Sequence, residues 1–426
     1  MITFELTCAQ NEYLSPGATL VDAIVTVTAE GGAGDQGAMP SPGAPRTELI
    51  IVDVSGSMGG KKIKEAANAA AAAVDCIDDG ALFALIAGNH MAWRLYPSAP
   101  GLSLAVSSAE TRAEARAAVS GLRAGGGTNI GAWLALATGL IAEQEGINHA
   151  ILLTDGQNGP DQAEELTQAL DDATGRFQCD CRGVGTDWAV AELREIAVAL
   201  LGTVDIVADP NDLAEDFAAM MHQSMGREVG HVDLRLSTPK GSTVTFVKQV
   251  FPEIVDLSDR GTTVNERATD YPTGAWGCEA RDYHVSIQVQ PGGVGDEMLA
   301  GRVTLMIDGE EGGQALIRAI WTEDLAQSTR INRGVAKYTD QAELADLVQD
   351  GLDALNAGDV DEATAKLGLA LRQAEELGND DRLADLAKLV EVEDEATGKV
   401  RLKRNIDPVA LMEAEVGSTK TERVKR

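Results

Sequence analysis

Residues 49–58 read Leu-Ile-Ile-Val-Asp-Val-Ser-Gly-Ser-Met, and this stretch decides the fold expected for the chain. An apolar run of strand length ends at Asp53, and Ser55 and Ser57 follow at alternate positions with a glycine between them. A helical pattern begins near Lys61, so the three side chains share one tight loop at the carboxyl end of a strand. Open α/β sheets place their ligand sites at that end of their parallel strands. Three hard oxygen groups so close together suit a small hard cation such as magnesium.

The composition limits the classes of protein to which the chain can belong. Its 426 residues suggest two or three domains, and an apolar content of 44% is ample for packed cores. A formal net charge of -32 argues against a general nucleic-acid binder, because phosphate contacts need clustered lysine and arginine. No apolar run reaches transmembrane length, and the N-terminus lacks the layout of a signal peptide. Five cysteines, an odd number, fit a reducing cytoplasm better than a disulfide framework.

From about residue 47 to residue 225, apolar strand runs alternate with helical patterns. The expected strands are Leu49–Asp53, Leu82–Ala87, Trp93–Tyr96, Ala150–Thr154, Phe177–Val184 and Val204–Val207. After the first strand, apolar residues fall on one face of a helix by their spacing: Ile63, Ala67, Ala70, Val74 and Ile77. This alternation predicts an α/β fold, with a doubly wound, mostly parallel sheet covered by helices on both faces.

Residues 230–323 change to a hydrophobic period of two, with turns rich in glycine and proline between the runs, which is typical of an antiparallel sandwich. Residues 1–29 show the same alternation in two short runs, and two strands alone are marginal in water. We therefore expect these strands to complete an antiparallel β-sandwich with residues 229–330, so that the α/β domain is an insertion in it. Residues 30–46, rich in glycine and proline, are expected to form a surface loop.

Helical periodicity returns between about residues 335 and 395. The stretch Gly358–Ala363 and the apolar positions after it are similar to the second helix of a tetratricopeptide repeat, with residues 342–355 as its partner. Because a solenoid needs several repeats, a helical cap on the sandwich is the simpler interpretation. The last stretch is interpreted as a polar, partly basic tail, mobile at its end, with a docking role as the alternative. The expected domain boundaries therefore give N-terminal strands with a linker (1–46), the α/β domain (47–228), the rest of the sandwich (229–330), the helical cap (331–398) and the tail (399–426).

Two later stretches complete the pattern at Asp53. Residues 125–131, Gly-Gly-Gly-Thr-Asn-Ile-Gly, precede a helical pattern, and residues 151–156, Ile-Leu-Leu-Thr-Asp-Gly, form a strand that ends in another aspartate. With these in place, residues 47–225 resemble the von Willebrand factor type A (VWA) domain in its bacterial intracellular form. The metal-ion-dependent adhesion site of that family reads D-x-S-x-S, then a distant threonine, then a distant aspartate. The matching residues here are Asp53, Ser55, Ser57, Thr128 and Asp155.

The resemblance implies that the serines bind a divalent metal directly, that Thr128 binds it directly or through water, and that the aspartates hold its shell. Magnesium is the expected ion, with manganese or calcium as alternatives. Neutral hydroxyl ligands leave the ion electropositive, so it seeks a carboxylate from outside. Asn129 and Gln157 lie close enough in sequence to line the rim, although a plain loop role is the simpler interpretation. The alternative for the serines is a degenerate site in which they only cap the next helix.

Sequence motifs typical of enzymes are weaker in this chain than the metal-site motif. No G-x-S-x-G elbow surrounds Ser55 or Ser57, and the spacing around Gly60 and Lys61 does not match a P-loop. The five histidines show no zinc spacing and are expected to be structural or exposed. Cys179 and Cys181 point to one face of a strand, where packing is favoured over metal or redox chemistry. Trp133 is expected in the core.

The function expected first is that of a non-catalytic, cytoplasmic binding protein, similar to bacterial intracellular members of the VWA family, whose metal site captures an aspartate or glutamate of a partner protein. A second hypothesis makes the chain the partner subunit of an AAA+ ATPase of the MoxR or chelatase kind. A third, a metal-dependent hydrolase, lacks a nameable general base. No membrane or nucleic-acid partner is expected. The resemblance further implies that the last helix of the domain, Leu213–Ser224, moves when ligand binds.

Overall fold

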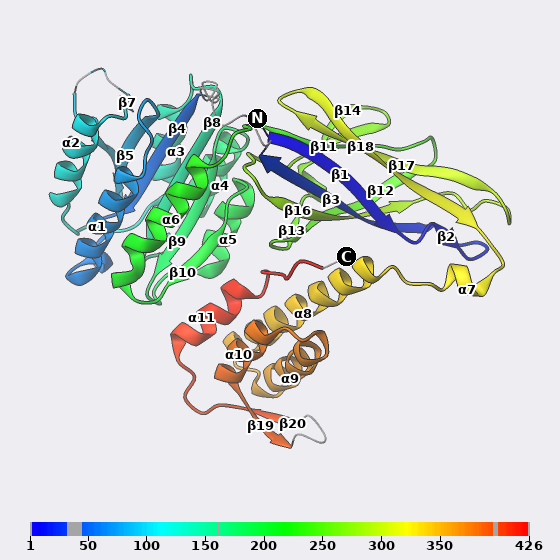
Figure 1. Cartoon of the computed structure of the whole chain (residues 1–426). Coiled ribbons are helices and arrows are strands. Elements are labelled where there is room, and N and C mark those ends of the chain that lie inside the picture. The colour runs from blue at the N-terminus through cyan, green and yellow to red at the C-terminus, as the bar shows by residue number, and fades with distance from the viewer. Residues whose placement is uncertain are drawn as a thin grey trace. The chain divides into compact units, whose positions relative to one another are not determined.

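The structure is a computed structural model that describes residues 2–31, 45–99, 101, 103–159, 162–394 and 399–424. The chain divides into two compact units (Figure 1). One unit is the α/β domain within residues 35–230, and the other combines the two ends of the chain. The expected fold class, with the α/β domain inserted in a sandwich that the N-terminal strands complete, is therefore confirmed. Most of the surface loop expected at residues 30–46 lies outside the described residues.

The α/β unit contains a seven-stranded sheet in the order β10-β9-β8-β4-β5-β6, with β7 paired to β5. Its strands are β4 (Arg46–Asp53), β5 (Leu82–Gly88), β6 (Ala92–Tyr96), β7 (Ala105–Val106), β8 (Ile147–Thr154), β9 (Gln178–Val184) and β10 (Val204–Val207). Only β6 and β7 run antiparallel to their neighbour β5. Nearly every residue of β4 is buried, because central parallel strands are covered on both faces.

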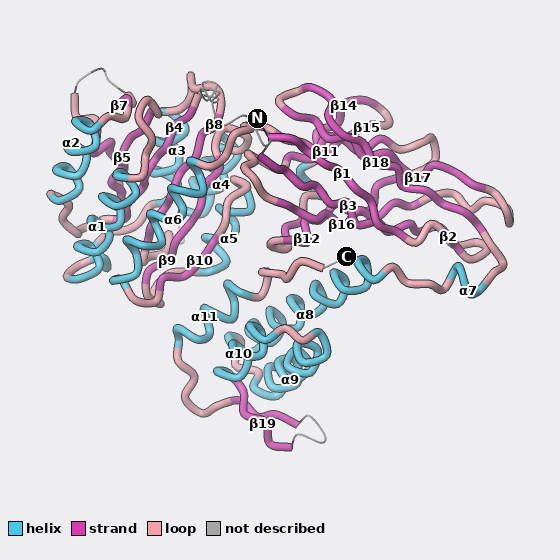
Figure 2. Tube along the Cα trace, in the orientation of Figure 1, coloured by secondary structure: helices cyan, strands magenta, loops and turns pink. Residues whose placement is uncertain are grey.

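Helices cover both faces of this sheet (Figure 2). They are α1 (Lys61–Asp75), α2 (Ala109–Ser120), α3 (Ile130–Leu140), α4 (Ala163–Ala173), α5 (Val190–Ala199) and α6 (Leu213–Met225), with short 3-10 turns η1 (Gly56–Met58) and η3 (Pro210–Asp212). Helices α1, α2 and α6 share one core with β4, β5 and β8. The face predicted for the first helix is inside this core, where Ile63, Ala70 and Val74 are buried. Helix α6 extends one residue beyond the expected end of the last helix.

The sandwich consists of two sheets in the second unit. One has the order β1-β3-β16-β12-β13 and the other the order β14-β15-β11-β17-β18-β2. The strands are β1 (Ile2–Gln10), β2 (Tyr13–Leu14), β3 (Leu20–Gly31), β11 (Val232–Ser237), β12 (Thr243–Phe251), β13 (Val255–Asp256), β14 (Thr262–Asn265), β15 (Ala268–Pro272), β16 (Ala280–Gln288), β17 (Glu297–Ile307) and β18 (Glu310–Trp321), with η4 (Ser258–Arg260). Strand β3 pairs antiparallel with β16, so the N-terminal strands are integral to the sandwich.

Helices follow the sandwich in the same unit: α7 (Leu325–Ser328), α8 (Arg333–Asn356), α9 (Val360–Leu377), α10 (Asp380–Leu389) and α11 (Pro408–Gly417), with a hairpin of β19 (Val390–Asp394) and β20 (Lys399–Leu402). Helices α8 and α9 form the expected hairpin. Asp359 caps α9 through the backbone N–H of Glu362, and Gly358 has a φ of +83° that suits the turn. No helix within the described ranges is both long and apolar enough to cross a membrane.

The stretch from residue 399 on was expected to be a polar tail, but most of it is ordered structure. Strand β20 pairs with β19, and α11 buries Ala410, Ala414 and Val416. Burial of the apolar residues of α11 stabilises the folded segment more than the nearby basic residues favour its exposure to solvent, because α11 shares one core with α8, α9 and α10. The segment after α11 also has backbone partners, since the N–H of Thr421 donates to the carbonyl of Pro252 at 3.0 Å.

Candidate metal centre

Both aspartates of the predicted site lie where the order of the sheet reverses. Strand β4 has its successor β5 on one side and the much later β8 on the other. Asp53 is the last residue of β4, and Asp155 follows β8 directly. Loops that leave parallel strands in opposite directions open a crevice at such a point, and ligands bind there. The topology therefore brings together two carboxylates that lie far apart in the sequence.

The carboxylate of Asp53 is completely buried and fixed on both oxygens. The backbone N–H of Ser55 donates to Oδ1 at 2.6 Å, and the hydroxyl of Thr154 donates to Oδ2 at 2.5 Å. Burial raises the pKa of Asp53, although these hydrogen bonds act in the opposite direction. Thr154 was not predicted as a site residue. Its only signal in the sequence is its place before Asp155 at the end of a strand.

The two serines form a hydroxyl pair next to Asp155. Their Oγ atoms lie 2.9 Å apart, and the Ser57 hydroxyl donates to Oδ1 of Asp155 at 2.6 Å. The alternative that they only cap a helix does not hold. Ser55 precedes η1 without a capping hydrogen bond from its side chain, and the N-cap of α1 is Gly60. Their hydroxyls are therefore directed into the site rather than used to start a helix.

Asp155 also binds a lysine that was not predicted as a site residue. The Lys62 ammonium donates to Oδ2 of Asp155 at 2.6 Å and lies 3.3 Å from Oδ2 of Asp187. Burial lowers the pKa of Lys62, but the two carboxylates outweigh burial and raise it. Each oxygen of Asp155 thus has a different partner, a serine hydroxyl on one side and an ammonium group on the other.

Thr128 reaches the site from the glycine-rich loop. This loop is tied to the β4 loop by backbone hydrogen bonds, because the N–H of Gly125 donates to the Val54 carbonyl at 2.8 Å and the N–H of Gly56 donates to the Gly126 carbonyl at 2.9 Å. Gly126 has a φ of +91°, and a Cβ there would lie 2.5 Å from the His90 ring. A glycine is therefore needed for this loop to pass His90, which lies in the loop after β5.

Gly156 marks the space that these groups surround. A Cβ at this position would lie 2.8 Å from Oγ1 of Thr128 and 3.7 Å from both Oδ2 of Asp53 and Oγ of Ser57. Three oxygens from two separate segments, residues 53–57 and the glycine-rich loop, thus face one small volume, which the missing side chain leaves open. Gly156 was not named as a site residue, although the sequence places it directly after Asp155.

These donors fit a divalent metal of the hard class. Within the described residues, no group of three or more histidine, cysteine, aspartate or glutamate side chains could hold a metal. The fit therefore depends on hydroxyl oxygens together with two carboxylates, which are ligands that magnesium accepts. Ser55, Ser57 and Thr128 would contact the ion, and the two aspartates would hold its shell. When bound, the ion would supply a positive centre that attracts a carboxylate.

The rim residues have mostly structural roles. Asn129 caps α3 by accepting a hydrogen bond from the Ala132 N–H at 3.1 Å, and its amide donates to Glu165 at 2.9 Å. Gln157 is exposed. Trp133 is fully buried, as expected, and its indole N–H donates to the carbonyl of Asn89 at 2.8 Å.

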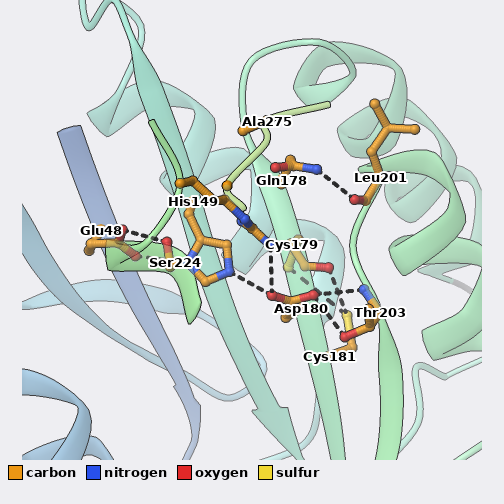
Figure 3. A network of polar contacts seen from close by, with 12 residues as sticks. Glu48, His149, Gln178, Cys179, Asp180, Cys181, Leu201, Thr203, Ser224 and Ala275 are labelled. Atoms are coloured by element: carbon orange, nitrogen blue, oxygen red, sulfur yellow. Dashed lines mark hydrogen bonds and ion pairs between the residues drawn. The ribbon is translucent and has the colours of Figure 1, made fainter. Parts of the chain in front are cut away.

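A buried charge network lies toward the opposite ends of the same strands (Figure 3). The ring of His149 on β8 bridges two carboxylates, with Nδ1 2.8 Å from Glu48 on β4 and Nε2 2.8 Å from Asp180 on β9. Burial lowers the pKa of His149, but Glu48 and Asp180 outweigh burial and raise it. The Ser224 hydroxyl on α6 donates to Glu48 at 2.7 Å, and Arg227 lies 3.6 Å from Asp180. The network therefore ties the end of α6 to the sheet.

The two cysteines of β9 belong to the packing around this network (Figure 3). Cys179 and Cys181 are fully buried, with their Sγ atoms 4.0 Å apart on one face of the strand. A hydrogen bond to Cys181 and burial both raise the pKa of Cys179, so its thiol stays protonated. A protonated thiol is a poor metal ligand and a poor nucleophile.

Comparison with known proteins agrees with this architecture. Residues 48–206 match the von Willebrand factor type A domain, and residues 373–418 match the von Willebrand factor type A C-terminal domain. A solved structure described as von Willebrand factor type A from Catenulispora acidiphila is 46% identical, with a TM-score of 0.93, over 99% of this chain and 97% of that one. The chain belongs to the von Willebrand factor type A family. Domains of this family generally mediate protein–protein interaction.

More distant relatives share the fold or part of the chain. The ArnB paralog VWA2 from Sulfolobus acidocaldarius has a TM-score of 0.60 at 15% identity, covers 98% of both chains and so shows the fold alone. An uncharacterized protein of Synechocystis is 24% identical over 50% of this chain, and human inter-alpha-trypsin inhibitor heavy chain H4 is 30% identical over 40% of it. The matched region spans half of the Synechocystis protein and 19% of the human one.

Proposed function

We propose that this VWA protein is a non-catalytic, divalent-metal-dependent binding protein whose metal site captures a carboxylate of a partner protein. One observation carries the proposal. Oxygens from the end of β4, from the loop that follows it and from the glycine-rich loop all face one space beside Gly156. Hydroxyl ligands neutralise little of the charge of a bound ion. The loaded site would therefore retain a strong attraction for an outside carboxylate.

Magnesium is the resident ion that we propose. Magnesium prefers oxygen ligands, and it releases its waters reluctantly. The site would supply few charges and several neutral oxygens, so at least one position of the ion would stay available to the partner. An odd number of cysteines, five in all, supports a reducing compartment such as the cytoplasm as the place where the protein works.

The test compares wild-type protein with Asp53→Asn and, as a matched control, with Asp171→Asn, which changes an exposed aspartate on α4. The Asp53→Asn change keeps the shape of the side chain and removes its charge. The Thr154 hydroxyl can reverse its role and accept from the new amide, so the fold is expected to survive. Manganese binding is read by electron paramagnetic resonance.

Binding of protein partners is read by affinity capture in magnesium and in EDTA. We expect the Asp53→Asn variant to lose manganese binding and metal-dependent capture, while Asp171→Asn keeps both. The proposal would be contradicted if the Asp53→Asn variant captured protein partners as strongly as wild type, both in magnesium and in EDTA. The functional surface would then lie elsewhere on the chain.

A further inference from the structure

Lys62 occupies a position that helix stability does not explain. Helix α1 begins with Lys61 and Lys62, and its first turn contains no acidic residue. The amino end of a helix carries partial positive charge, so lysines there destabilise the helix slightly, whereas aspartate or glutamate would stabilise it. A lysine at this position is therefore better explained by what its side chain contacts.

The side chain of Lys62 joins three segments around the metal centre. It extends from the start of α1 to Asp155 after β8 and to Asp187 after β9. Only 24% of the side chain is exposed. The loop after β9 lies in van der Waals contact with it, since a Cβ on Gly185 would lie 3.7 Å from Cε and Nζ of Lys62, and the φ of +69° at this residue favours glycine. The ammonium group is thus held in place rather than freely solvated.

The neighbouring lysine behaves differently. Lys61 lies 3.7 Å from Asp209, and both side chains are 57% exposed. An exposed ion pair of this kind contributes little, because solvent screens it. Lys62 instead contacts a carboxylate that is fully buried and that also accepts from Ser57. The two adjacent lysines therefore provide a natural contrast between a charge inside the site and a charge outside it.

The charge of Lys62 acts on both steps of binding, but in opposite directions. The site has two buried carboxylates, Asp53 and Asp155, and the ammonium group, which it shares with the exposed Asp187, offsets part of their charge. A less negative shell attracts a divalent cation more weakly. The same reduction leaves the bound ion less neutralised, so its pull on an incoming carboxylate is stronger.

We propose that Lys62 determines the specificity of the metal site by lowering its affinity for the free ion and raising the affinity of the loaded site for a carboxylate. This inference rests on the proposed function, since it assumes that the site binds a metal. It identifies the partner group as an anion that meets two positive charges at once, the ion and the ammonium group. A neutral ligand such as an amide would gain nothing from Lys62.

The experiment uses the full chain as wild type, Lys62→Met, Lys62→Arg and Lys61→Met. Manganese affinity is measured by electron paramagnetic resonance. Acetate is the carboxylate probe, and its binding is measured from the relaxation of its methyl protons by the manganese-loaded protein. The melting temperature in EDTA shows that each variant is folded.

We expect Lys62→Met to bind manganese roughly tenfold more tightly and acetate roughly threefold more weakly than wild type, because an offsetting charge next to the site has been removed. Lys62→Arg, which keeps the charge, and Lys61→Met should both stay close to wild type. Loss of Lys62 as a purely structural support would instead weaken both binding steps.

Manganese binding by Lys62→Met that is equal to or weaker than wild type overturns this inference alone, and so does unchanged acetate binding. A wild-type protein that binds no manganese overturns the proposed function together with this inference. The two failures are therefore distinguishable in the same set of measurements.

Discussion

Replacement of His149 by phenylalanine tests whether the buried network holds the α/β unit together. The side chains of His149 and Glu48 are fully buried, and that of Asp180 is 7% exposed. Phenylalanine keeps a ring of similar size but removes both hydrogen bonds. Asp180 retains Thr203, whose N–H and hydroxyl both donate to Oδ1, whereas Glu48 retains the neutral hydroxyl of Ser224. The variant would thus leave a buried carboxylate without its cation.

Loss of one partner from a buried ion pair costs about 3–5 kcal/mol of unfolding free energy, because the remaining charge stays desolvated. The α/β unit lies within residues 35–230. An unfolding entropy of about 2.1 cal/mol/K per residue over about 200 residues gives about 0.4 kcal/mol/K, so the expected fall in melting temperature is about 10 °C.

The effect should depend on pH with a definite sign. The pKa of His149 is raised above its ordinary value of 6.5, so the folded state binds the proton more tightly than the unfolded state. The stability from His149 is therefore fully present below about pH 6.5 and is lost as the pH rises through the raised pKa. As the pH rises, wild type should lose this part of its stability. The difference in melting temperature between wild type and His149→Phe should therefore become smaller.

Calorimetry at pH 6 and at successively higher pH, in EDTA, measures both effects. Hydrogen exchange read on peptides of β8 locates the loss of stability. His90→Phe is the control, since it makes the same chemical change at an exposed histidine of the same unit. A shift below about 2 °C at pH 6, or a difference from wild type that stays constant as the pH rises, would refute the reasoning.

Two further variants test other parts of the chain. Gly156→Ala should weaken manganese binding without removing any ligand, because its Cβ would lie 2.8 Å from Oγ1 of Thr128; unchanged affinity measured by electron paramagnetic resonance would show that the open space is not the metal site. Tyr338→Phe should lower the unfolding free energy of the sandwich unit by about 1–3 kcal/mol, because the tyrosine hydroxyl binds the buried Asp282 and accepts from the Val424 N–H. Faster proteolytic cleavage after α11 is the expected readout, and wild-type resistance to the protease would contradict it.

Local patterns were enough to predict the parallel sheet and the sandwich. Strand β4 could be recognised because a central parallel strand is apolar at nearly every position, and sandwich strands such as β11 because their residues alternate between buried and partly exposed. Helix α11, in contrast, was not predicted from its local pattern. Six of its ten residues are apolar and only Glu413 and Glu415 are charged, but the apolar positions show no clear helical period. The helix is stabilised mainly by the core it shares with α8, α9 and α10.

The same distinction applies to the site. Asp53, Ser55 and Ser57 lie within one loop, so their proximity was determined by the sequence itself. That Thr128 and Gly156 face one space, and that Lys62 binds Asp155, was decided only by the tertiary structure. Sequence patterns describe neighbours along the chain and along one face of an element. Contacts between a helix start and the end of a distant strand depend on strand order and loop path, which only the packed sheet sets.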